Sequence, residues 1–510
     1  MHYIKNDSGR NWVSPRSRKP LSRKIYPKVK RLAAVWLRYQ GLVALGLGAA
    51  YSLTYITLSV LRHQSYHSFG FDLGLFNQVF WNTTQGRPFE STMSQALPVP
   101  HSLLGDHFSP VFLALIPFYF AYPHPETLLV MQTLALALGA WPVYLLARLK
   151  LPDGYAAWWV LAYLLFVPLA YINMYDFHEV ALSVALLGFA LYSLERGRFG
   201  WFLVSLLFTF LVKEEMALIG VGFGAYVLLA KRDWKLGVGV LAGSLLAFFA
   251  VIQIAIPFFG GGRSYPYIGI RYSDVGGSPG GILRTLVTNP LRIARALLQP
   301  KKIYFLVAIF GPGLGLSALA GWAALLLLPT LGYLLLSNYE PQYSFTSQYS
   351  APLIPLVVGT AILALARLRE SIRAPVMAAV VVSSLLFSWA FGDMPFSRKF
   401  DLSLYSTQSR YAAFVPHLSL IAPDARVSAE NGFPSHLSER CYIYDFGFEG
   451  VQDAEWVVLD YEGTSYDITA FQAQVAAVEA AGYNEVASGY GLSLLHATTR
   501  QATVSRPGCQ

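Results

Sequence analysis

Long uninterrupted apolar runs constrain this chain more than any other feature. Within residues 39–391, several runs reach the roughly 17–25 apolar residues that a helix needs to cross a bilayer. The runs are continuous, whereas a membrane β-barrel would show short alternating segments. Charged residues make up only 13% of the 510 residues, compared with about 25% in an ordinary soluble domain. The sequence therefore predicts an all-α polytopic membrane protein.

Basic residues cluster in residues 1–38, directly before the first predicted span at 39–61. A nucleic-acid-binding tail is one interpretation of such a cluster. Beside a membrane span we favour a cytoplasmic tail, because cationic flanks stay on the cytoplasmic side and contact anionic lipid. We therefore expect no nucleic-acid partner. The loop that follows the first span, residues 62–125, is then expected outside.

Short basic loops predict how the remaining spans are oriented. The segment 108–122 is apolar, but it is short and is broken by Pro110, Pro117 and Pro123. If it re-enters rather than crosses, the basic loops that follow lie inside, as the positive-inside rule expects. About eleven spans result, at 39–61, 126–148, 155–173, 179–195, 200–213, 216–231, 236–258, 303–317, 318–336, 351–367 and 374–391.

The composition changes after residue 391. Residues 392–510 alternate short β-like runs with polar turns, and an Ala-rich helix is expected at 468–481. We predict a small α/β domain outside the membrane. Its two cysteines, Cys441 and Cys509, would then lie in an oxidising compartment, where pairing is allowed but not required. The β-like runs are 426–429, 441–444, 456–459 and 492–495.

Ionisable side chains gather on the predicted outer side. Such groups are costly at membrane depth and are functional candidates by default. Asp72 is the strongest candidate, because it lies between Phe71 and Leu73 at the start of an amphipathic stretch. The sequence predicts an outer cavity that contains Asp72 as the catalytic base, with substrate contacts from Asp106, His107, Asp176, His178, Glu179, Lys213, Glu214, Arg263, Arg271 and Tyr349.

Simpler structural roles stand beside these assignments. An acidic residue is favoured at a helix N-terminus, and surface cations contact lipid headgroups. The alternatives are helix capping by Asp176 and Glu179, a local pair of Lys213 with Glu214, a backbone hydrogen bond for His107, and headgroup contacts for Arg263 and Arg271.

A divalent cation is a further hypothesis for the outer side. Mixed carboxylate and imidazole ligands suit Mn²⁺ or Zn²⁺, and Mg²⁺ is the other candidate. The ligands would come from Asp106, His107, Asp176, His178 and Glu179, with His107, Asp176 and His178 as the central set. No other cofactor is expected, because the chain has no phosphate-binding or dinucleotide-binding signature.

Several short motifs together resemble the DUF2079 family of prokaryotic membrane proteins, whose name implies no activity. The architecture also resembles the GT-C glycosyltransferases, such as protein O-mannosyltransferases, aminoarabinose transferases and the oligosaccharyltransferase catalytic subunit. The first-loop motif here is Asp-Leu-Gly, whereas Asp-Glu or Asp-x-Asp is usual in those enzymes. The DUF2079-like motifs are Phe71-Asp72-Leu73-Gly74, Gly105-Asp106-His107-Phe108, Asp176-Phe177-His178-Glu179, Lys213-Glu214-Glu215 and Gln348-Tyr349-Ser350.

The resemblance implies a membrane glycosyltransferase that uses a polyprenyl-phosphate-linked sugar on the outer face of the prokaryotic cytoplasmic membrane. Asp72 matches the first-loop acid of the GT-C enzymes in position, and Asp176 with Glu179 matches their second acidic cluster. The acceptor, whether glycan, lipid or protein, is left open. Two rivals remain: a transporter or flippase, and a non-catalytic protein whose C-terminal domain binds a partner.

Overall fold

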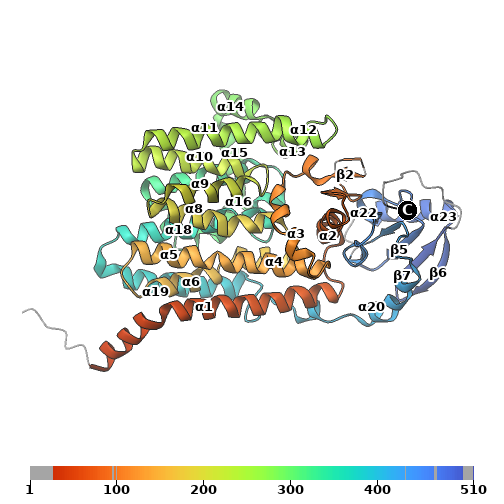
Figure 1. The fold of residues 1–510 in the computed structure, drawn as a ribbon, viewed down its shortest axis with the longest axis horizontal. Coiled ribbons are helices and arrows are strands. Elements are labelled where there is room, and N and C mark those ends of the chain that lie inside the picture. The colour runs from red at the N-terminus through yellow and green to blue at the C-terminus, as the bar shows by residue number, and fades with distance from the viewer. Residues whose placement is uncertain are drawn as a thin grey trace, which may run out of the picture.

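The computed structural model describes residues 27–94, 97–98, 100–430, 432–463, 468–497 and 509. Most of the expected basic tail, residues 1–26, lies outside the described residues. A bundle of helices forms the larger part of the molecule, and a β-sheet formed by the C-terminal part of the chain lies at one end of the bundle (Figure 1).

The bundle is assembled around α18 (Leu353–Arg367), whose apolar span is 94% buried. Its residues are almost all Leu, Ile, Val and Ala, and a helix that is apolar on every side is stable only when it is surrounded. The other long helices of the bundle are α1 (Pro27–Gln64), α4 (Pro125–Leu138), α5 (Ala140–Lys150), α8 (Leu182–Glu195), α9 (Phe199–Phe210), α10 (Met216–Tyr226), α11 (Trp234–Ala250), α16 (Pro300–Phe310) and α19 (Glu370–Phe391).

The predicted number of eleven spans is not confirmed. Among the described residues, five helical segments are long and apolar enough to cross a membrane, and a sixth results if a bent pair counts as one span. The five are Val35–Gln64, Pro125–Lys150, Trp234–Phe259, Gln348–Arg367 and Glu370–Phe391, and the bent pair is α6 (Ala156–Leu164) with α7 (Val167–Met174).

Prolines stand where several apolar runs are divided. The axes of α6 and α7 differ by 50°, and Pro168 stands at the start of α7, where its missing N–H costs no hydrogen bond. The segment 108–122 contains only a 3₁₀ turn, Pro110–Ala114, and the one-turn helix α3 (Ile116–Tyr119). It therefore does not cross the membrane as a helix, in agreement with the sequence analysis.

The C-terminal sheet has the strand order β4-β3-β5-β7-β6. The strands β4, β3 and β5 are parallel, whereas β7 is antiparallel to both β5 and β6. Four strands and α23 (Ile468–Ala480) match the predicted segments, while β6 was not predicted because its sequence NEVASG lacks an apolar alternation. The strands are β3 (Val427–Ala429), β4 (Ile443–Asp445), β5 (Trp456–Asp460), β6 (Asn484–Gly489) and β7 (Leu492–His496).

The sheet region packs tightly on the membrane part. The short helix α21 (Phe433–His436) lies against α2 (Gly70–Thr84), and Phe433 belongs to the same buried core as the bundle. A Cβ atom at Gly74 would lie 3.2 Å from the backbone of Pro434, so the two helices approach closely at this glycine. Cys441 and Cys509 form a disulfide, which settles the pairing that the sequence left open.

His436 makes the stability of this packing depend on pH. Its ring stacks on His63 at 4.0 Å, and its Nε2 lies 3.0 Å from the His63 carbonyl oxygen. Burial lowers the pKa of His436 to about 4, whereas an exposed histidine has a pKa of about 6.5. The unfolded chain therefore binds more protons between these values, so stability is complete above pH 6.5 and is lost as the pH falls toward 4.

We expect the free energy of unfolding to fall by about 2 kcal/mol between pH 6.5 and pH 5 through this residue. Thermal unfolding of the wild type and of His436→Phe, measured across that range, checks the expectation. The phenylalanine keeps the stacking but cannot be protonated, so its curve should be flatter. Two curves of equal slope would contradict the assignment.

Candidate active site

A polar cavity of about 380 Å³ lies between the bundle and the C-terminal sheet region. Most of the sequence-predicted site residues meet here. Asp72, Asp106, His107, His178, Glu179, Lys213, Arg271 and Tyr349 all line it, together with Phe448 from the short helix α22 (Phe446–Glu449). The fold therefore brings these distant segments of the sequence together around one cavity.

Asp72 stands in the first turn of α2 and is the accessible carboxylate of this cavity. Its side chain is 30% exposed, and its Oδ1 lies 3.6 Å from Nε2 of His178. An acidic residue in the first turn of a helix is stabilised by the helix dipole. A carboxylate in this position can accept a proton from a bound hydroxyl group.

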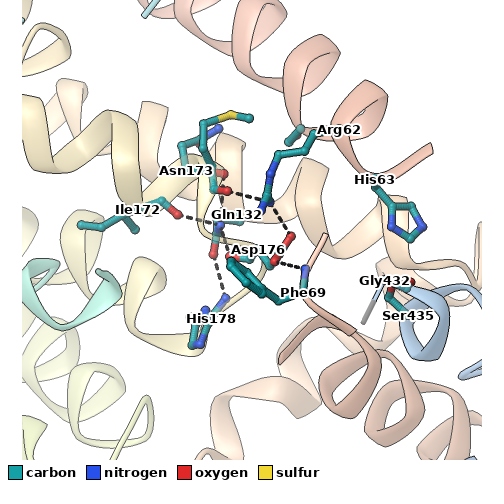
Figure 2. Close-up of polar contacts among 12 residues, drawn as sticks. Arg62, His63, Phe69, Gln132, Ile172, Asn173, Asp176, His178, Gly432 and Ser435 are labelled. Atoms are coloured by element: carbon teal, nitrogen blue, oxygen red, sulfur yellow. Dashed lines mark hydrogen bonds and ion pairs between the residues drawn. The ribbon is translucent and has the colours of Figure 1, made fainter. Parts of the chain in front are cut away.

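Asp176 does not line the cavity but fixes the start of α2. Figure 2 shows its carboxylate between Arg62 and Phe69. The Arg62 guanidinium donates to Oδ1 at 2.9 Å, and the backbone N–H of Phe69, the residue that precedes α2, donates to Oδ2 at 2.8 Å. Asp176 is buried and adopts a left-handed φ of 75°. The substrate-contact assignment is thus replaced by a positioning role, because both carboxylate oxygens are bound within the protein.

Gln132 on α4 holds the turn that carries Asp176 and His178 (Figure 2). Its side-chain amide donates to the carbonyl oxygens of Ile172, at 3.0 Å, and Asp176, at 2.6 Å. Its carbonyl oxygen accepts from the His178 backbone N–H at 2.8 Å. Neither Gln132 nor Arg62 was singled out from the sequence, since an isolated glutamine in an apolar run gives no signal of such a contact.

Glu179 and Lys213 form a buried ion pair in the cavity wall. The Lys213 Nζ lies 2.7 Å from Glu179 Oε1, and the two side chains are 3% and 0% exposed. The sequence analysis predicted a substrate contact for Lys213 and gave a pair with its neighbour Glu214 as an alternative, whereas the structure pairs Lys213 with Glu179. The reason is that Lys213 and Glu214 follow α9 in a turn and their side chains point to different partners.

We expect Lys213→Met to lower the free energy of unfolding by about 3 kcal/mol, because it leaves the Glu179 carboxylate buried without a counter-ion. Chemical denaturation of the purified protein measures the change. The double variant Lys213→Met/Glu179→Leu should regain most of the loss. Lys301→Met is the matched control, since its exposed pair with Glu340 contributes little. A double variant no more stable than the single one would contradict the pairing.

His107 and Glu214 form a second ion pair at the cavity edge. The Nδ1 atom of His107 lies 3.0 Å from Glu214 Oε1, and Tyr265 donates its hydroxyl to the same oxygen at 2.6 Å. Burial and Lys213 oppose protonation of His107, but Glu214 and Asp106 outweigh them and raise its pKa. Burial opposes ionisation of Glu214, but His107 and Lys213 lower its pKa. Both shifts favour a protonated imidazole beside a carboxylate.

Arg271 is the cation of this cavity that is available to bind an anion. Its guanidinium lies over the rings of Tyr267 at 4.4 Å, Tyr339 at 4.8 Å and Tyr349 at 5.5 Å. Within the described part of the chain, no carboxylate lies within ion-pair distance of it. Stacking on aromatic faces orients a guanidinium while its N–H groups stay free to bind an anion.

A second cavity, of about 500 Å³, adjoins the polar one. Arg271 and Tyr267 line both cavities. The second cavity is mainly apolar. Its walls come from α10, α11, the π-helical turn Val251–Ala255 that follows α11, α17 (Leu328–Leu336) and α14 (Pro279–Thr288), and they include Leu218, Val221, Leu245, Phe248, Ile252, Leu328 and Ile282. Together the two cavities can hold a molecule with a polar head and an apolar tail, with an anionic group at Arg271.

Arg263 lies apart from this arrangement. It lines a different cavity, of about 850 Å³, between the segment 88–113 and the residues 259–263. The structure thus separates the two arginines that the sequence proposed as alternative phosphate contacts.

The residues predicted to bind a metal do not point to a common position. Within the described ranges, no three His, Cys, Asp or Glu side chains are grouped to hold an ion. Asp176 is bound to Arg62, and His107 is bound to Glu214. The proposed set His107, Asp176 and His178 is therefore not assembled at one point.

The sequence matches the model of one known protein family. The family described as "Predicted membrane protein (DUF2079)" matches residues 62–494. The chain belongs to the DUF2079 family. A comparison with curated proteins finds no significant match.

The fold of this DUF2079 protein is similar to that of solved membrane-protein structures named ArnT. ArnT from Cupriavidus metallidurans bound to undecaprenyl phosphate matches with a TM-score of 0.54 and 13% identity, over 88% of this chain and 97% of that one. Its apo state matches with a TM-score of 0.53 and 14% identity, over 91% and 98%. An Archaeoglobus fulgidus oligosaccharyltransferase in the apo form is less similar, with a TM-score of 0.41 and 13% identity over 82% and 70%. The two ArnT matches show that this chain shares the fold of ArnT over most of its length.

Proposed function

We propose that this DUF2079 protein is an integral membrane glycosyltransferase that moves a sugar from a polyprenyl-phosphate-linked donor to an acceptor outside the cytoplasmic membrane. The observation that carries the proposal is the pair of adjoining cavities that share Arg271. A lipid-linked sugar phosphate has the matching order of parts. Its sugar would lie in the polar cavity beside Asp72, its phosphate at Arg271, and its polyprenyl chain in the apolar cavity.

The reaction would be a displacement at the sugar C1. Asp72 takes the proton of an acceptor hydroxyl as the oxygen attacks C1. The bond between C1 and the phosphate oxygen breaks, and the electron pair leaves with the lipid phosphate. Arg271 stabilises the charge that develops on that phosphate. Asp176 and Arg62 contribute indirectly, because they fix the first turn of α2 and thereby Asp72.

The available cations favour a monophosphate donor. Lys213 is neutralised by Glu179, which leaves Arg271 as the cavity cation without a carboxylate partner among the described residues. One arginine matches the charge of a phosphodiester better than that of a diphosphate. Transfer assays with EDTA, with or without added Mn²⁺ or Mg²⁺, test the hypothesis of a divalent cation.

A transporter or flippase is the second candidate. It would need a polar path that continues toward the other side of the membrane. The candidate site residues gather instead at the end of the bundle next to the C-terminal sheet, which favours the transferase.

Lipid binding tests the proposal directly. We expect undecaprenyl phosphate at about 100 times its dissociation constant to raise the unfolding temperature by about 3 °C. Undecaprenol has the same chain without the phosphate and should give a much smaller shift. Thermal unfolding in detergent with either lipid measures both. Equal shifts would show that the phosphate is not recognised and would count against the proposed donor.

A further inference from the structure

A third cavity, of about 480 Å³, lies at the end of the bundle away from Asp72. It is formed by α1, α5 and α8. In Figure 1, α5 lies on the side of the bundle away from the C-terminal sheet. Arg148 stands in the last turn of α5, and Arg196 directly follows α8. Both line this cavity, which we call the arginine groove.

The floor of the arginine groove is apolar and aromatic. Trp141 and Tyr144 stack with their rings 5.5 Å apart and only 14° from parallel. Trp141 is 38% exposed, and Leu45 of α1 is 56% exposed. Exposed apolar side chains at this position on a membrane helix face lipid chains. The groove therefore joins a surface for acyl chains to a pair of cations.

The two arginines differ from the lysines around them. Lys150 and Lys231 both pair with the buried carboxylate of Glu195, Lys231 at 2.7 Å. Arg148 has only a loose contact with Asp153, 3.6 Å long, in which the two side chains are 50% and 65% exposed. Such a pair is weak and screened by solvent.

Arg196 is held in place without a carboxylate partner among the residues that the structure describes. It donates from its guanidinium to the Tyr192 hydroxyl at 2.9 Å and lies over the same ring at 5.9 Å. Tyr192 also lines the groove. Both lysines are thus held by the Glu195 carboxylate, whereas the two arginines line the cavity, and one of them is oriented by a tyrosine.

We propose that the arginine groove binds one anionic phospholipid. Its phosphodiester would bind Arg148 and Arg196, and an acyl chain would lie along Leu45 and Trp141. The basic loops at this end place it in the cytoplasmic leaflet by the positive-inside rule, where anionic headgroups attract cations. The combination of an apolar floor with two cations favours a lipid over a free phosphate ion. The site is independent of the proposed transfer reaction, because it shares no residue with the cavities around Arg271.

Retention of phosphatidylglycerol by the full-length protein tests the proposal. Each arginine near an anionic headgroup is expected to contribute about a fivefold preference. In nanodiscs that contain phosphatidylcholine with a small fraction of phosphatidylglycerol, native mass spectrometry after extraction should show one phosphatidylglycerol retained about 25-fold over phosphatidylcholine. The variant Arg148→Gln/Arg196→Gln should lose this preference.

The matched control is Arg198→Gln/Arg232→Gln, which removes two cations from the basic loops at the same end but none from the groove. It should retain phosphatidylglycerol as the wild type does. Equal retention by the groove variant would overturn the proposal, and so would an equal loss in the control variant, which would indicate general surface attraction. Displacement of the lipid by millimolar inorganic phosphate would also overturn it, in favour of a free-anion site.

Discussion

Asp72→Asn is expected to lower the rate of sugar transfer by about 10³-fold or more, since general acid–base catalysis contributes about 10²–10⁴-fold. The amide has the size of the carboxylate but cannot take the acceptor's proton. Asp72 is the cavity carboxylate with the best access, because Glu179 is paired with Lys213, and Asp106 accepts the Tyr267 hydroxyl at 2.7 Å. Transfer from a radiolabelled polyprenyl-phosphate sugar to host membranes measures the rate.

Donor binding separates a catalytic role for Asp72 from a structural one. The rise in unfolding temperature with undecaprenyl phosphate should be the same in Asp72→Asn and in the wild type, since Arg271 and the apolar cavity are unchanged. Asp424→Asn, an exposed aspartate in the C-terminal part, is the matched control and should keep full transfer. Transfer by Asp72→Asn within about threefold of the wild type would rule out Asp72 as the base.

The placement of Asp72 could be predicted because two features of the sequence agree. Its neighbours are apolar, and the basic loops place its segment outside the membrane. The basic loops predict which ends of the spans lie outside the membrane. The acidic residues of the candidate site stand at those outer ends. Most residues singled out on this basis meet in one cavity. The C-terminal sheet was predictable for a similar reason, because β3, β5 and β7 are short apolar runs between polar turns.

The contacts among site residues could not be predicted, because they depend on side-chain direction. Asp176 lies only two residues before His178, but its backbone is left-handed. Its carboxylate binds Arg62 and does not line the cavity. Arg263 and Arg271 follow the same helix, but only Arg271 is stacked between tyrosines. Hydropathy does not show where helices break, so the division between α6 and α7 was missed.

Arg271→Gln is expected to lower kcat/KM for the lipid-linked donor by about 10³-fold, as loss of one group that stabilises a developing charge costs about 10²–10³. Loss of the cation where the two cavities meet should weaken binding of the donor phosphate. It should also slow the departure of that phosphate from the sugar. The undecaprenyl phosphate shift in unfolding temperature should therefore shrink toward that of undecaprenol. This separates the variant from Asp72→Asn, which should keep that shift.

Two further variants make the assignment of Arg271 specific. Arg271→Lys keeps the charge but loses the planar group that stacks on Tyr267 and Tyr339, so it should recover only part of the activity. Arg263→Gln removes the neighbouring arginine, which lines a separate cavity, and should change transfer by less than about twofold. If Arg263→Gln lost as much activity as Arg271→Gln, the phosphate would not be bound where the two cavities meet, and the order of sugar, phosphate and lipid chain proposed here would be wrong.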